Sequence, residues 1–303
     1  MEGLASFSHT GNIGDVYSAI PAMRQFFLKT GRSIRLYLVK DVYGEYYEGA
    51  VHPTKDVSGR NVMLNSKMIE MMTPLLLAQG FIKEVIAITE EEYKTTDILC
   101  HLEWIRESNV GMPAFPIQKW YSTIFPDLDF DLSEIWLNVP DSEKDLAKGK
   151  IMVTRSERYT NHLLDYSFLK PYEDDILFCG TMREWNIFSM TYDLNVQKFN
   201  INNFLELAQA IKQCKFHISN QTQAFQLSEG LKTPRMLEAC VAAPNCIPVG
   251  KDAFYYLNQV KLECDFHKLN GSLSEAAVHQ KLKGDSEKRL AEMESLKDIN
   301  KPG

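Results

Sequence analysis

Three short polar segments carry the residue types that bind phosphate groups. The first is Gly11-Asn12-Ile13-Gly14-Asp15, which follows an apolar stretch at residues 4–7 and precedes a helical pattern. Glycines let the backbone approach a ligand closely, and a helix N-terminus favours an anion. Asp15 stands at the start of that helix, where an aspartate is also an ordinary N-cap. Spacing alone leaves both interpretations of Asp15 open.

The other two segments lie later in the chain. Thr154-Arg155-Ser156-Glu157-Arg158 follows a predicted strand. Its two arginines suit a diphosphate, because a guanidinium group binds phosphate oxygens in a bidentate manner. Ser219-Asn220-Gln221-Thr222-Gln223 stands between a strand and a helix, where hydroxyl and amide groups join a helix N-terminus. The alternatives are a solvated charged loop for the first segment and ordinary helix capping for the second.

The elements that position these segments alternate between strand and helix. Apolar residues at helical spacing predict a helix over 16–27 with Gly31 as its C-cap, and residues 34–39 indicate a buried strand. Such a β-loop-α-β unit is typical of a parallel sheet. Further strands are predicted at 85–88, 98–102, 150–154, 175–179, 195–199, 215–219 and 246–249, and further helices at 67–79, 203–214 and 222–231.

A change of composition divides the chain in two. Four prolines occur between residues 111 and 140, and the charged run 141–150 follows them. We therefore predict an α/β protein of two domains, 1–145 and 146–303. The charged tail from 272 to 300 has a helical period, and it could pack back on the first domain.

Composition restricts the class of protein. Hydrophobic residues make up 45% of the 303, which is enough for a real core. The net charge of −7 argues mildly against duplex DNA as the main partner, although a local basic patch stays open. The apolar runs are too short to cross a bilayer, and the N-terminus lacks the pattern of a secretory signal. With six cysteines and no C-x-x-C pair, reduced thiols and a cytoplasmic location are expected.

Two features suggest a metal and are interpreted otherwise. Asp127-Leu128-Asp129-Phe130-Asp131 contains overlapping D-x-D patterns, whose carboxylate oxygens can hold a divalent cation. Here the pattern follows Pro126 in an irregular region, so we predict a solvated turn. The cysteines and histidines show no zinc spacing. No metal and no cofactor are expected.

Two stretches of the chain resemble one family. Gly14-Asp15-Val16 is followed by Pro21-Ala22-Met23, which begins six residues after Asp15, and Pro234 lies eight residues after Gln226. The first spacing is similar to the "GD-(x)n-PAL" opening of the heptosyltransferases, glycosyltransferase family 9. The second is similar to that family's "D-[ST]-G-x-x-H-L" block and its following proline. The resemblance covers both domains and is weakest from 41 to 135.

The resemblance implies a GT-B fold, with two Rossmann-like domains that face a central cleft. It makes the first domain the acceptor domain and the second the nucleotide-sugar donor domain. Asp15 then matches the family's general base, Arg158 its phosphate-binding lysine, and Glu184 the residue that holds the nucleotide ribose. The residues placed at the donor site are Gly14, Thr154, Arg155, Arg158, Glu184, Gln221, Thr222, Gln223 and Gln226.

Three departures from the family concern the donor site. Gln221, Gln223 and Gln226 stand where the family has an acidic residue, a glycine and a histidine. They imply a sugar other than heptose, or a donor site that has decayed. The expected function is therefore an inverting, metal-independent transfer of a sugar from a nucleotide-diphosphate sugar to an acceptor hydroxyl.

Three alternatives stay open on the sequence. One is a transferase that acts on a modified nucleic-acid base, and a basic patch beside Asp15 would favour it. Another is a non-catalytic, GT-B-shaped binding protein, which the three glutamines favour. The third, more remote, is a nucleotide-sugar epimerase with a similar two-domain architecture.

Overall fold

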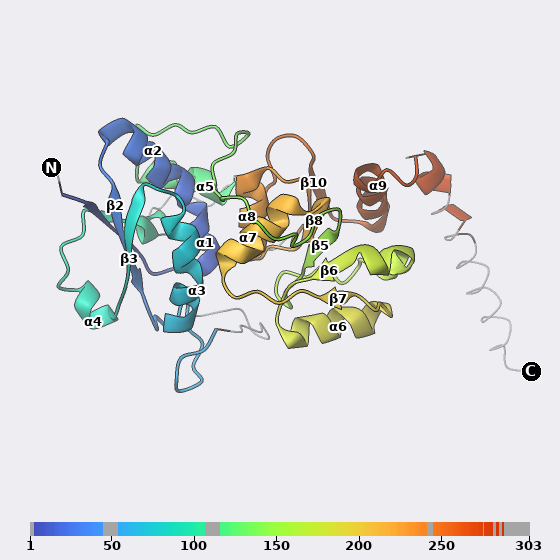
Figure 1. The fold of residues 1–303 in the computed structure, drawn as a ribbon, viewed down its shortest axis with the longest axis horizontal. Helices are drawn as coiled ribbons and strands as arrows, with labels where there is room; N and C mark the ends of the chain where they lie inside the picture. The colour runs from blue at the N-terminus through green and yellow to red at the C-terminus, as the bar shows by residue number, and fades with distance from the viewer. Residues whose placement is uncertain are drawn as a thin grey trace, which may run out of the picture.

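Two parallel β-sheets follow one another along the chain (Figure 1). The computed structural model describes residues 3–44, 54–106, 116–240, 245–274, 276–280, 283–284 and 287. In this part of the chain the first sheet has the order β3-β2-β1-β4 and the second the order β10-β9-β8-β5-β6-β7. The predicted α/β class with two successive parallel sheets is confirmed.

The strands are short and mostly buried, as parallel strands covered on both faces must be. Those of the first sheet are β1 (Ala5–His9), β2 (Ile34–Val39), β3 (Ile82–Ile88) and β4 (Cys100–His101). Those of the second are β5 (Ile151–Thr154), β6 (Ile176–Phe178), β7 (Gln197–Lys198), β8 (Phe216–Ser219), β9 (Arg235–Glu238) and β10 (Ala253–Tyr256). The predicted boundary at 145–146 lies in the stretch between β4 and β5.

The helices that pack around the first sheet are α1 (Ile13–Ser18), α2 (Ile20–Thr30), α3 (Ser66–Leu77), α4 (Glu90–Tyr93) and α5 (Ile117–Trp120), with the 3₁₀ turns η1 (Leu102–Arg106) and η2 (Tyr121–Thr123). The single helix predicted over 16–27 is divided into α1 and α2 at Ala19. Pro21 explains the division, because it has no N–H to donate to the carbonyl of Tyr17 and lies instead in the first turn of α2.

The second sheet carries η3 (Ser167–Asp175), α6 (Met182–Tyr192), α7 (Phe204–Gln213), α8 (Gln223–Leu231) and α9 (Gln259–Asn270). Helix α7 begins where the sequence predicts, and the Asn203 Oδ1 atom accepts a hydrogen bond of 3.0 Å from the Glu206 backbone N–H. Helix α9 was not predicted, because the helical periodicity of apolar residues in its charged sequence is weak. Phe266 buries it against Phe216 of β8 and Phe168 of η3.

The two domains share one hydrophobic core. Helices α1 and α3 of the first domain meet α7 and α8 of the second at the centre of the molecule (Figure 1). The Tyr17 ring of α1 packs edge-on against the Phe204 ring of α7, with centroids 6.4 Å apart. Backbone N–H groups of Trp136 and Leu137 donate to the Gly230 carbonyl of α8. The contact between the domains is therefore tightly packed.

Three predicted elements differ from the structure. Residues 246–249 form no strand: Pro248 removes one N–H, and the backbone of Val249 bonds instead to the side chains of Glu229 and Arg235. The strand predicted at 98–102 is reduced to β4, because Leu102 already begins η1. The described part of the charged tail follows α9 at the end of the second domain, away from the first sheet (Figure 1). Residues 288–303 of that tail lie outside the described residues.

Candidate functional site

The strand order predicts where a ligand can bind. In the first sheet the chain builds β2 and β3 on one side of β1 and then returns to place β4 on the other side. In the second sheet β6 and β7 lie on one side of β5, and β8 lies on the other. Ligands of open parallel sheets bind at the carboxyl ends of the strands beside such a reversal. The loops after β1, β4, β5 and β8 are therefore the candidate site.

A cavity of about 710 Å³ lies between these loops. Its walls come from both domains, and all ten residues predicted for the site line it: Gly14, Asp15, Thr154, Arg155, Arg158, Glu184, Gln221, Thr222, Gln223 and Gln226. A Cβ atom built on Gly14 would lie 3.9 Å from the Gln223 Cα atom, so the starts of α1 and α8 nearly touch. The two predicted half-sites thus form one space, whose ligand remains a prediction.

Asp15 is fixed through one of its two carboxylate oxygens. Its Oδ2 atom accepts a hydrogen bond of 2.7 Å from Nη2 of Arg106 and one of 3.2 Å from the Asn12 backbone N–H. The residue is 8% exposed and lines the cavity. Because both of these donors go to Oδ2, the Oδ1 atom is left for a ligand as far as the described residues are concerned. Arg106 lies 91 residues from Asp15, and no motif predicts this pair.

A chain of buried hydrogen bonds holds the backbone of the Asp15 loop in place. The Gly11 N–H donates to Nδ1 of His9 at 2.8 Å, so the neutral imidazole carries its proton on Nε2. That N–H donates to the hydroxyl of Tyr121 at 3.0 Å, which in turn donates to the Asp15 carbonyl at 2.8 Å. Burial lowers the pKa of His9, although Asp15 and Glu103 partly oppose this, and the lowering keeps the ring neutral.

Thr154 can only accept hydrogen bonds from a ligand. Ser228 donates its hydroxyl proton to the Phe225 carbonyl at 3.0 Å, so it accepts from Nδ1 of His217 at 2.9 Å. Burial lowers the pKa of His217 to about 3, and the neutral ring then accepts from Thr154 Oγ1 at 2.8 Å. The single hydroxyl proton of Thr154 is thus already donated, and its free lone pair remains for the cavity.

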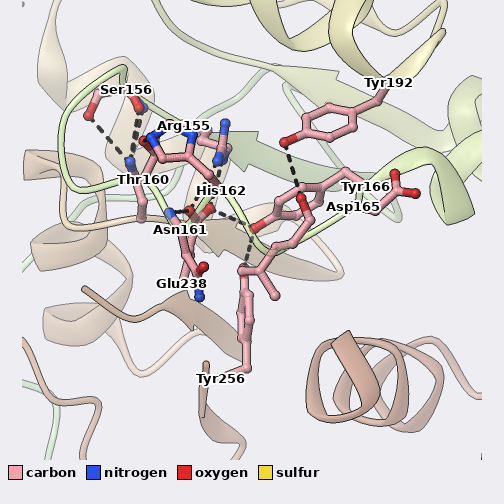
Figure 2. Close-up of polar contacts among 12 residues, drawn as sticks. Arg155, Ser156, Thr160, Asn161, His162, Asp165, Tyr166, Tyr192, Glu238 and Tyr256 are labelled. Carbon is pink, nitrogen blue, oxygen red and sulfur yellow. Dashed lines mark hydrogen bonds and ion pairs between the residues drawn. The ribbon is translucent and has the colours of Figure 1, made fainter. Parts of the chain in front are cut away.

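Arg155 is committed to a buried ion pair (Figure 2). Its Nε and Nη2 atoms donate to the two carboxylate oxygens of Glu238 at 2.7 and 3.0 Å. The hydroxyl of Tyr166 and the backbone N–H of Asn161 donate to the same carboxylate. Burial alone would lower the pKa of Arg155, but the hydrogen bonds with Glu238 outweigh it and raise this pKa. Arg155 therefore lines the cavity while its guanidinium anchors the loop after β5.

Asn220 holds the same loop from β8. Its Oδ1 atom accepts from the Ser156 N–H at 3.0 Å, and its Nδ2 atom donates to the carbonyls of Ser156 and Arg158 at 2.9 and 2.6 Å. Asn220 is fully buried. Its amide mimics a neighbouring strand, since it bonds the backbone of the loop on both sides. The sequence places Asn220 beside the site, but its partners lie more than 60 residues away.

The start of α8 offers polar groups to the cavity. Thr222 is the N-cap residue, but its side chain does not cap the helix. Among the described residues, Thr222 Oγ1 and Gln223 Oε1 are buried atoms without a hydrogen-bond partner. The first N–H groups of a helix also lack partners within it and attract an anion. These groups can bind either a diphosphate or water molecules, and their position in the cavity favours the diphosphate.

Gln226 connects the two domains. Its Oε1 atom accepts a buried hydrogen bond of 2.6 Å from Nε2 of Gln118, which belongs to α5 of the first domain. One residue earlier, the Ile117 N–H donates to the Asn245 carbonyl at 2.9 Å. The Nε2 atom of Gln226 donates to Sγ of Cys246, which also lines the cavity, at 3.9 Å. The sequence predicted the position of Gln226 but not this contact.

Glu184 begins α6 as part of a capping box. Its Oε2 atom accepts from the Thr181 N–H at 2.7 Å, and its own N–H donates to Thr181 Oγ1 at 3.2 Å. It lies at the far end of the cavity wall, beside Gly180. A capping carboxylate still has one oxygen free, so its assignment to the nucleotide ribose stays a prediction.

The charges on the cavity wall favour an anion. Arg106 is paired with Asp15 and Arg155 with Glu238. The remaining charged residues that line the cavity are Lys67, Arg158, Lys198 and Glu184. Two walls therefore contribute cations, since Lys67 belongs to α3 and the other two belong to the second domain.

The D-x-D segment lies on the surface, as predicted. Asp127, Asp129 and Asp131 are exposed and alternate with buried residues. Asp129 forms an ion pair of 3.1 Å with Lys119, and Asp131 accepts from the Ser133 N–H. Within the described ranges no group of three His, Cys, Asp or Glu side chains could hold a metal ion, and no helix has the length and apolar character needed to span a bilayer.

Comparison with known proteins gives matches by structure only. No family model and no curated protein matches the sequence. The glycosyl transferase family 9 protein of Veillonella parvula matches with a TM-score of 0.53 and 9% identity, over 92% of this chain and 96% of that one. The E. coli ADP-heptose lps heptosyltransferase II gives 0.57 and 11% over 93% and 98%, and E. coli heptosyltransferase WaaC with ADP gives 0.54 and 10% over 93% and 99%. The chain therefore has the two-domain fold of these glycosyltransferases, and the resemblance noted in its motifs is confirmed at the level of the fold.

Proposed function

We propose that this chain is a glycosyltransferase that moves a sugar from a nucleotide-diphosphate sugar to an acceptor hydroxyl, with inversion, without a metal and with Asp15 as the general base. The observation that carries this proposal is the position of Asp15. Its carboxylate lies in the wall of a cavity that the N-terminus of α8 enters from the other domain. The structural neighbours with the same fold support the proposal, since their names are those of sugar transferases.

The donor diphosphate would lie at the start of α8. The N–H groups there, the Thr222 hydroxyl and the Arg158 guanidinium are oriented before the reaction, so they stabilise the leaving diphosphate without reorganisation. The Thr154 oxygen, which can only accept, suits a hydroxyl of the nucleotide or sugar. Lys198 adds positive charge on the same side.

The acceptor would enter from the first domain. Its hydroxyl oxygen attacks the anomeric carbon while Asp15 Oδ1 takes the hydroxyl proton, and the bond from that carbon to the diphosphate breaks with its electron pair. The nucleoside diphosphate leaves, and one displacement inverts the configuration. Arg106 and the Asn12 N–H hold Oδ2, so the free oxygen keeps a fixed direction.

A two-part experiment tests this proposal. Thermal shift is measured with ADP, UDP and GDP and with ADP-glucose, UDP-glucose and GDP-mannose, because a ligand that binds only the native state raises its apparent stability. Released diphosphate is then measured for the wild type, Asp15→Asn and the surface control Asp129→Asn. We expect Asp15→Asn to lose roughly 10² to 10⁴-fold in turnover and to keep nucleotide binding.

Three results would count against the proposal in different ways. Wild-type turnover in Asp15→Asn would remove Asp15 as the base. If no nucleotide raises the Tm of the wild type, the non-catalytic binding protein is favoured instead. Turnover that chelators abolish and a divalent metal restores would contradict a metal-independent reaction.

A further inference from the structure

Tyr159 has a backbone conformation that large side chains rarely adopt. Its φ is +54°, in the left-handed region. The other non-glycine residues with positive φ in the described part of the chain are Asp41, Asp193, Lys232 and Asp252. Asp193 and Lys232 simply end α6 and α8 as C-caps, and aspartate tolerates this region. Tyr159 ends no helix, and among these five it alone lines the cavity.

The surrounding loop holds Tyr159 in that conformation. On its N-terminal side, Asn220 binds the carbonyls of Ser156 and Arg158. On its C-terminal side, the Asn161 N–H donates to Glu238, which the Arg155 ion pair holds in turn (Figure 2). Buried groups thus fix the chain one and three residues before Tyr159 and two residues after it. Strained residues persist when their surroundings determine them in this way, and they cluster at functional sites.

Tyr159 lines the cavity that joins the two half-sites. The Arg158 guanidinium, on the donor side, lies 5.5 Å from the ring centroid. On the base side, the pKa of Arg106 is raised mainly by Asp15, and Tyr121 and Tyr159 contribute after it. The phenol therefore lies near the Arg106–Asp15 pair. A group in this position is beside the place where the base and the diphosphate must both reach the substrate.

We propose that Tyr159 is a further substrate-positioning residue, whose ring packs against the ring of the transferred sugar and holds its anomeric carbon between Asp15 and the leaving diphosphate. The inference rests on the proposed glycosyl transfer and adds a residue that the sequence motifs do not contain. A tyrosine presents a flat apolar face and a polar tip, which suits the C–H face and the hydroxyls of a sugar.

The test compares nucleotides with and without their sugar. The variants are Tyr159→Gly and Tyr159→Asn, which both accept positive φ but lack the ring, and Tyr159→Phe, which keeps it. The matched control is Asp193→Gly, at a φ of +50° outside the cavity. Dissociation constants are measured for UDP against UDP-glucose, ADP against ADP-glucose and GDP against GDP-mannose, and the pair that the wild type binds best is used for turnover.

The expected result is a selective loss. Tyr159→Gly and Tyr159→Asn should bind the nucleotide sugar and turn it over about tenfold less well or worse, and bind the bare diphosphate within about threefold of the wild type. Their Tm should stay near the wild-type value or above it, because the backbone strain is relieved. Tyr159→Phe and Asp193→Gly should keep the wild-type preference for the sugar.

Other outcomes overturn the inference. If both ring-less variants keep the wild-type ratio of affinities and the wild-type turnover, Tyr159 does not contact the sugar. If they lose diphosphate and nucleotide sugar equally, the ring acts only through Arg158. If the wild type binds no nucleotide, the proposed function fails and the inference with it, which the first two outcomes do not imply.

Discussion

The ion pair of Arg155 and Glu238 allows a sharp test of what the loop after β5 does. Glu238 is fully buried and accepts two hydrogen bonds from Arg155 and one of 2.8 Å from Tyr166 (Figure 2). Glu238→Gln keeps the shape but leaves the Arg155 guanidinium without a counter-charge. Removing one partner of a buried pair costs about 3–5 kcal/mol of the free energy of unfolding. For a domain of this size that lowers Tm by on the order of 10 °C.

Arg155→Met should cost a similar amount, since it leaves the Glu238 carboxylate buried and unpaired. The double variant Arg155→Met/Glu238→Gln should cost less than the sum of the two, by about 1–3 kcal/mol, as expected for groups in direct contact. Urea unfolding followed by tryptophan fluorescence measures all three. Nucleotide affinity is measured on each folded variant in parallel.

The result that would refute this reasoning is specific. If Arg155→Met keeps the wild-type stability and loses more than about tenfold in nucleotide affinity, which is about 1.4 kcal/mol, then Arg155 is a direct donor ligand. That outcome would restore the assignment that the motif alone suggests. The structure argues for the opposite, because the Nε and Nη2 atoms of Arg155 are already bound to Glu238.

Three further predictions concern other parts of the site. Gly11→Ala places a Cβ atom 2.6 Å from His9 Cε1 and 2.9 Å from Asp15 Oδ2, so turnover should fall by about 10²-fold, and wild-type turnover would contradict this. In Gly14→Ala the new Cβ atom lies 3.9 Å from its nearest neighbour, so this variant should keep the wild-type Tm. The pKa of His217 is about 3 in the folded protein, below its unfolded value. Its contribution to the free energy of unfolding is therefore full above pH 6.5 and falls by about 2 kcal/mol at pH 5. His217→Asn should reduce this pH dependence of the urea midpoint. Gln118→Ala should cost about 1–3 kcal/mol by leaving Gln226 Oε1 unpaired, and replacing both glutamines by methionine should recover most of it.

The sequence predicted which segments meet at the cavity, and the reason is topological. Residues 11–15, 154–158 and 219–223 each follow a strand, and parallel strands bring their carboxyl ends to one edge of a sheet. The position of a segment after a strand therefore determines its position in space. The two domains and the strands at 34–39 and 215–219 follow from the same local pattern.

What each side chain does could not be predicted, because its partner is distant in the chain. The Arg155 partner lies 83 residues away, the Gln226 partner 108 and the Asp15 partner 91. Local pattern contains no information on such pairs. The strand predicted at 246–249 is wrong for a related reason: the side chains of Glu229 and Arg235, from α8 and β9, take over the backbone bonds that a neighbouring strand would provide.

These contacts also bear on the three glutamines that set this chain apart. A decayed donor site would be expected to show loose amide side chains, but the Gln226 oxygen accepts a buried hydrogen bond from Gln118. The Thr154 hydroxyl donates its hydrogen bond to His217, so only a lone pair of its oxygen is left for a ligand. Gln226 and Thr154 thus have fixed hydrogen-bond partners, and the chain has amides where the family that it resembles has a carboxylate and an imidazole. For the proposed transfer, uncharged amides at these positions suit the hydroxyl groups of a neutral sugar, which argues for altered specificity in preference to lost activity.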